Sequence, residues 1–145
     1  MSESLTYSIE LPVYPERVYR AWLDGGEHQK ISGQSASIDA RVGGQFALLD
    51  GRVKGEILAL TPHDRIVQTW QMEEFAGAGG AELDAKIELR FEPTCTGTEL
   101  RLHQEGIPDG KTPDVIQWWE DNIFRPFRAY FEEIVGEYVA DMGDG

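Results

Sequence analysis

The chain has 145 residues, a length typical of one domain that can bury a core without disulfides or metal ions. Its 26 acidic residues against 13 lysines and arginines give a net charge of −13, which argues against binding to nucleic-acid phosphate or to anionic membranes. The single cysteine, Cys95, excludes an intrachain disulfide and a cysteine-based metal site.

Neither a leader nor a membrane span is indicated by the sequence. The first residues lack the basic start and the apolar run of a signal peptide. No apolar stretch approaches the roughly 18 residues needed to cross a bilayer. We therefore expect a cytoplasmic protein with no membrane insertion, folded as a single domain over residues 1–145 with its core at about 5–138.

The N-terminal part predicts one strand followed by two short helices. Residues 5–11 alternate between apolar and polar side chains, which is typical of a half-buried strand, and Pro12 ends it. Pro15 suits the first position of a helix, where its missing N–H is no loss. We expect Gly25-Gly26 to end that helix and a second, weaker helical turn to follow over 27–31.

The middle of the chain predicts a run of short strands. Turn signals such as Gly43-Gly44 and Asp50-Gly51 separate segments of alternating polarity. These segments are 35–41, 45–50, 52–60, 65–72, 85–91 and 98–105. With the first strand they make seven, and consecutive strands joined by short turns are expected to pair antiparallel.

The C-terminal part predicts a loop and one long helix. Residues 106–110 have strong turn chemistry, and Thr112 can cap a helix that has Pro113 at its first position. The helix should run to about Tyr138, roughly 40 Å at 1.5 Å per residue, with a kink where Pro126 lacks its N–H. Its apolar face is too broad for edge packing, so we expect an α+β fold in which a curved antiparallel sheet surrounds the helix.

Catalytic and metal-binding patterns are absent from the sequence. His28, His63 and His103 lie far apart and are interpreted as surface histidines, so we expect no metal. No nucleophile elbow exists, and Cys95 is read as an exposed turn thiol. The Gly77–Gly80 segment fits no phosphate-binding frame and is interpreted as a flexible loop.

Paired carboxylates could in principle serve general acid–base catalysis, but neither Glu73-Glu74 nor Glu132-Glu133 converges with other groups in the sequence pattern. We therefore assign no catalytic residue and no cofactor.

The side chains expected to face the interior from sheet and helix have two interpretations: a simple core, or the wall of a pocket for an apolar ligand. Inward polar groups favour the pocket, because a dry core would strand their hydrogen-bonding atoms. The candidate cavity residues are Tyr7, Phe46, Leu48, Ile57, Gln68, Trp70, Ile87, Leu89, Leu102, Gln104, Trp118, Trp119, Ile123 and Phe127.

Several segments together resemble one family. They are Val18–Asp24, Ile38–Phe46, Gly51–Glu56, Arg65–Trp70, Gly97–Leu100, Gly106–Pro108, and a final helix with Trp118-Trp119 and Phe124–Phe127. As a set, covering roughly residues 5–135, they resemble the activator of heat-shock-protein-90 ATPase homologue family, of the C-terminal-domain type. That family belongs to the START-like, helix-grip superfamily.

The resemblance implies a START-like helix-grip fold and three functional hypotheses. The first is a non-catalytic domain that binds a hydrophobic small molecule between sheet and C-terminal helix, the usual theme of the superfamily. The second is a co-chaperone-like module acting on a chaperone ATPase. The third is a cyclase- or hydrolase-type enzyme. One departure bears on the second hypothesis, since Phe75–Gly80 stands where the family often has a Trp-Pro-x-Gly-His-x-Ser segment.

Overall fold

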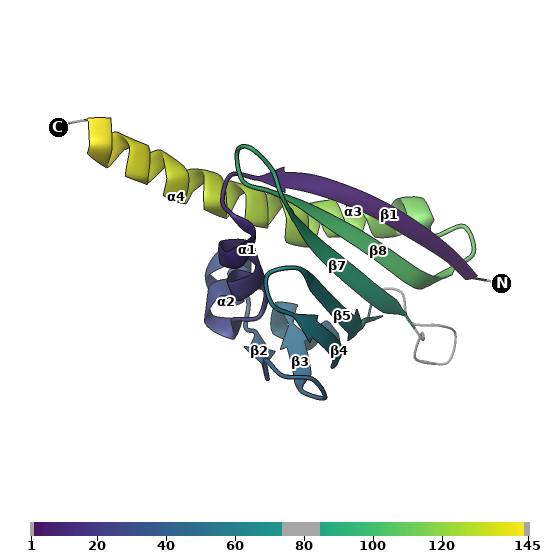
Figure 1. Ribbon diagram of the computed structural model, residues 1–145. Helices are drawn as coiled ribbons and strands as arrows, with labels where there is room; N and C mark the ends of the chain where they lie inside the picture. The colour runs from purple at the N-terminus through teal and green to yellow at the C-terminus, as the bar shows by residue number, and fades with distance from the viewer. Residues whose placement is uncertain (1, 74–84, 144–145) are drawn as a thin grey trace.

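The computed structural model describes residues 2–73 and 85–143 (Figure 1). The strands are β1 (Ser2–Leu11), β2 (Ser37–Ile38), β3 (Gln45–Leu48), β4 (Val53–Thr61), β5 (Arg65–Thr69), β6 (Gln71–Met72), β7 (Lys86–Pro93) and β8 (Thr98–Pro108). They pair antiparallel in the order β1-β8-β7-β5-β4-β3-β2, with β6 on β4. The predicted α+β fold is confirmed, with eight strands in place of seven because one predicted segment forms both β5 and β6.

That segment, expected as a continuous strand over 65–72, is interrupted at Trp70. β5 pairs with β4 and β7, whereas β6 pairs with the start of β4, where Lys54 lies opposite Gln71. The backbone N–H of Trp70 donates to the carbonyl of Ala85 at 2.9 Å. Trp70 therefore stands at the point where the sheet changes partners.

The first and last strands of the sheet are longer than the sequence indicated. The loop expected at 106–110 is wrong in its first half, because residues up to Pro108 continue β8. They do so because β1 also starts earlier and supplies partners, with Glu3 opposite Ile107. Leu5 and Tyr7 of β1 lie opposite Gln104 and Leu102.

Two short helices follow β1, as predicted: α1 (Pro15–Trp22) and α2 (Gly25–Ser32). Gly25-Gly26 begins α2 instead of merely ending α1. The side chain of Asp24 explains this difference, since its Oδ1 accepts a hydrogen bond from the N–H of Glu27 at 3.2 Å and caps α2.

The C-terminal helix consists of α3 (Thr112–Trp119), a π-helical turn (Glu120–Phe124) and α4 (Arg125–Gly143). It lies along one face of the sheet and extends beyond it (Figure 1). A kink was predicted at Pro126, and the structure has a π-helical turn that ends two residues before this proline. The expected Thr112 cap is wrong: Thr112 lies inside the helix and its hydroxyl donates to Glu3 Oε1 at 2.8 Å.

None of the helices in the described ranges is long and apolar enough to cross a membrane.

Candidate functional site

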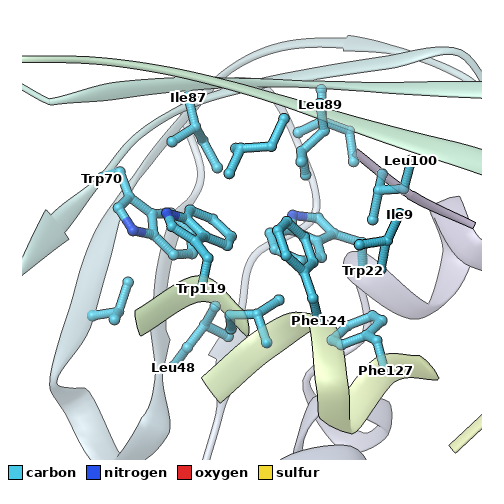
Figure 2. Packing of buried hydrophobic residues seen from close by; sticks show 14 of the residues in the cluster. Ile9, Trp22, Leu48, Trp70, Ile87, Leu89, Leu100, Trp119, Phe124 and Phe127 are labelled. Carbon is cyan, nitrogen blue, oxygen red and sulfur yellow. The ribbon is translucent and has the colours of Figure 1, made fainter. Parts of the chain in front are cut away.

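The inner face of the sheet and the C-terminal helix share one interior, as the candidate cavity residues predicted. All of these residues except Tyr7 are buried. They come from β3, β4, β5, β7 and β8, with Trp70 between β5 and β6, on one side and from α3, the π-helical turn and α4 on the other. The apolar candidates belong to one hydrophobic cluster, against which Tyr7 packs. Figure 2 shows Leu48, Trp70, Ile87, Leu89, Trp119 and Phe127 in this cluster.

Stacked aromatic rings fill the centre of this interior. The rings of Trp70 and Trp119 lie 4.7 Å apart between centroids with an interplanar angle of 19° (Figure 2). Trp22 of α1 stacks on both, at 6.2 Å and 6.4 Å, and Phe124 stacks on Trp119 at 5.4 Å. Stacks of this kind add stability beyond the apolar area they bury. Trp22 was missed as a site residue, although its place four residues after Val18 marks a buried helix face.

Two glutamines satisfy two of the indole groups. Trp22 Nε1 donates to Gln68 Oε1 at 2.8 Å, and Trp119 Nε1 donates to Gln104 Oε1 at 2.7 Å. Both glutamines are 2% exposed. The sequence indicated that inward-facing glutamines would need hydrogen-bond partners. The structure supplies these partners within the protein, as tryptophan N–H groups that the sequence pattern did not identify.

The third indole is different. Trp70 is fully buried, and its Nε1 has no hydrogen-bond partner within the described part of the chain. Its ring neighbours are aromatic: Phe46 at 5.7 Å, Trp118 at 6.4 Å, and the two stacked tryptophans. A buried donor without an acceptor is rare and destabilising, so Trp70 is the place where this core is incomplete.

Tyr7 closes one end of the interior. It is partly buried, and its ring stacks on Phe124 at 5.4 Å. Its hydroxyl donates to Glu120 Oε2 at 3.1 Å, while Glu120 Oε1 lies 3.3 Å from Arg128. Burial, followed by the hydrogen bond to Glu120, raises the pKa of Tyr7 above its ordinary value. The phenol therefore stays protonated and ties β1 to the π-helical turn.

A similar network ties α4 to the two short helices. The hydroxyl of Tyr130 donates to Glu27 Oε2 at 2.9 Å, and Arg17 lies 2.6 Å from Glu27 Oε1. The guanidinium of Arg17 also lies over the ring of Phe131, 5.3 Å from its centroid. The C-terminal helix is thus held at both ends of the aromatic cluster.

The interpretation of His28 as a surface residue is wrong. It is 4% exposed, and its ring lies between those of Trp22 and Phe127, at 5.2 Å and 5.3 Å. Its Nε2 lies 2.7 Å from the carbonyl oxygen of Trp22, so this nitrogen carries the proton. Burial lowers the pKa of His28 to about 4, outweighing the opposite effects of the Trp22 carbonyl and nearby carboxylates.

The other predicted functional features are simpler. His63 is exposed, and His103 lies on the outer face of β8 beside Thr6 and Glu105. Cys95 is exposed, as expected. Within residues 2–73 and 85–143, no three histidine, cysteine, aspartate or glutamate side chains are grouped to hold a metal ion. The glycine-rich segment 77–80 and residue 74 of the first carboxylate pair lie outside the described residues.

A hollow of about 560 Å³ opens on the outer face of the sheet. Gln45, Lys54 and Thr69 line it, and along their strands these residues alternate with side chains that face the aromatic interior. The sheet therefore separates this hollow from the stacked rings.

Comparison with known protein families identifies the family of this chain. Residues 12–132 match the family model of the activator of Hsp90 ATPase homolog 1-like proteins. The chain belongs to this family. The START-like helix-grip fold expected from the sequence is therefore confirmed.

Solved structures agree with this assignment. An HSP90 activator from Plasmodium falciparum is 25% identical, with a TM-score of 0.71 over 94% of this chain and 96% of that one. A protein from Chromobacterium violaceum is 29% identical, with a TM-score of 0.69 over 89% and 96%. A protein of the same family from Aeromonas hydrophila, 18% identical with a TM-score of 0.65 over 91% and 94%, shares the fold. No curated protein matches the chain significantly.

Proposed function

We propose that this domain binds a small apolar molecule between the inner face of its sheet and its C-terminal helix. The observation that carries the proposal is the unpaired, fully buried N–H of Trp70. The other two indoles of the stack each have a glutamine acceptor. An unmatched donor in such a core is explained if another molecule supplies the acceptor when it is bound.

Both walls of the interior depart from regular structure near Trp70. On the sheet side, the strand is interrupted at Trp70, between β5 and β6. On the helix side, the π-helical turn begins directly after Trp119 and ends with Phe124, and such turns occur frequently at functional sites.

Calorimetry and thermal unfolding with 1-tetralone, a two-ring molecule with one acceptor oxygen, test the proposal. A ligand present at one hundred times its dissociation constant stabilises the folded state by about 2.7 kcal/mol, which for a chain of this length raises the melting temperature by roughly 9 °C. We expect saturable binding and this rise. Its absence up to the solubility limits of 1-tetralone, tetralin and their ring-substituted analogues would refute the proposal.

A matched variant locates the site. Ile87→Phe enlarges a buried side chain on the inner face of β7, whereas Lys86→Met changes its exposed neighbour on the outer face. We expect weaker or slower 1-tetralone binding only with the first. Equal effects of the two variants would place the ligand elsewhere.

A second candidate function is interaction with a chaperone ATPase, supported by the likeness to the Plasmodium falciparum HSP90 activator. The net charge of −13 suits docking on a basic surface of the partner. The test is co-precipitation and ATPase stimulation with the cognate chaperone. Absence of both at low salt, where electrostatic attraction is strongest, would rule it out.

A further inference from the structure

The chemistry around Trp70 restricts what a bound molecule can be. Four aromatic rings surround the Trp70 indole. Its N–H has no hydrogen-bond acceptor among the described residues. A pure hydrocarbon would leave that donor unpaired. A molecule with an acceptor oxygen would form the missing hydrogen bond to this N–H. Because the N–H is already removed from water in the folded protein, binding would add no further cost of desolvating it.

The interior also restricts the charge of the molecule. The buried polar side chains of the described residues are His28, Gln68, Thr98 and Gln104, and none of them is a permanent cation. Two partly buried arginines of the helices, Arg17 of α1 and Arg128 of α4, are already paired with Glu27 and Glu120. An anion placed at Trp70 would be a buried charge without a counter-ion, which is strongly unfavourable.

The shape of the surroundings favours a flat molecule. Trp70 and Trp119 are nearly parallel, and Trp22 is tilted only 22° from Trp70. A planar ring system can replace or extend such a stack, whereas a flexible chain would lose more conformational freedom on entering it.

We infer that the ligand is a flat, uncharged, apolar molecule bearing a carbonyl or ether oxygen, and that this oxygen accepts a hydrogen bond from Trp70 Nε1. This inference rests on the proposed function and adds the chemical class of the ligand. It assigns Trp70 as the residue that distinguishes an oxygen-bearing ligand from a hydrocarbon of the same shape.

Three matched probes test the class: tetralin, 1-tetralone and 1,2,3,4-tetrahydro-1-naphthoate, which share one ring skeleton. We expect 1-tetralone to bind the wild-type chain about tenfold more tightly than tetralin, as one hydrogen bond to an already desolvated donor allows. The carboxylate should bind most weakly. In Trp70→Phe, which keeps an aromatic ring and removes the N–H, tetralin and 1-tetralone should bind equally.

Trp22→Phe is the matched control. It makes the same change in the same stack, but the N–H it removes already has Gln68 as its acceptor. Overall affinity can change in this variant, yet the preference for the ketone should remain. Loss of the preference in both variants, or in neither, overturns the assignment of Trp70.

A measurement on the wild-type chain keeps the test independent of variant stability. With ¹⁵N-labelled tryptophan, the Nε1–H signal of Trp70 should move downfield with 1-tetralone and not with tetralin. A signal that exchanges magnetisation with a bound water, both free and with 1-tetralone present, means that water is the acceptor and overturns the inference. Equal binding of tetralin and 1-tetralone overturns the ligand class but leaves the proposed function standing, whereas binding of no probe refutes both.

Discussion

Protonation of His28 provides a sharp test of how the helices pack. The imidazole is buried between Trp22 and Phe127, and its pKa falls from an ordinary 6.5 to about 4. In the unfolded chain the same group titrates near its ordinary value. Well above pH 6.5 it is neutral in both states and has no effect on stability. As the pH falls below 6.5, the unfolded chain binds a proton that the folded chain does not, so stability is lost until about pH 4.

The size of this loss follows from the two pKa values. Between pH 7 and pH 5 the unfolded state gains about 2 kcal/mol relative to the folded state from this group alone. For a chain of 145 residues that corresponds to a fall in melting temperature of roughly 6 °C. Asp24 and Glu27 act in the opposite direction by favouring the imidazolium, but burial is the largest effect.

The assay is urea unfolding at pH 7 and pH 5 for the wild-type chain and for His28→Gln. Glutamine does not titrate, and its amide can still donate to the carbonyl of Trp22, which accepts from Nε2 of His28 at 2.7 Å. The other carboxylates and histidines contribute equally to both proteins and cancel in the difference. We expect the wild type to lose about 2 kcal/mol more than the variant between the two pH values. Equal losses would mean that His28 is not held neutral and that α2 does not pack on α4 as described.

Three further predictions follow from particular contacts, each measured by urea unfolding at pH 7. Gln104→Leu leaves Trp119 Nε1 buried without its acceptor and should destabilise the fold by about 1–3 kcal/mol; a neutral result would contradict the hydrogen bond. Gly55→Ala places a methyl carbon 2.3 Å from the carbonyl oxygen of Thr69 and should cost about 1–3 kcal/mol, because β4 and β5 must separate. Gly136→Ala meets no atom within 4 Å on an exposed helix face and should stabilise by about 1 kcal/mol; a loss of stability would argue against a helix there.

The sequence predicted the architecture because its main signals are local. Alternating polarity in β1 and β8 and three-or-four spacing in the C-terminal helix show which side chains face inward, and burial follows from that. The candidate cavity residues were chosen in this way, and their burial agrees with the structure for all except Tyr7, while their role in binding stays a prediction. Pro126 marked the neighbourhood of an irregular turn, since the π-helical turn ends two residues before it.

What sequence reasoning missed depends on contacts between distant segments. The burial of His28 is set by Phe127, about one hundred residues later, and by the cap at Asp24 that turns α2 toward α4. The one local signal was the three-residue spacing between His28 and Ile31, which puts both on the same helix face. The pairing of glutamines with indoles was equally out of reach, since alternation assigns a side chain to a face but not to a partner.

The position of the irregular backbone is the strongest argument that this interior does more than stabilise the fold. The sheet changes partners at Trp70, and the helix loses its α-helical hydrogen bonding just after Trp119. These two residues stack on each other at 4.7 Å, so both walls depart from regular structure at the same level. The unpaired N–H lies at that level as well. Sequences under selection for stability alone tend to agree with the fold at every position, and such agreement is relaxed at functional sites. Three departures that meet at one pair of stacked indoles therefore favour a site that another molecule completes.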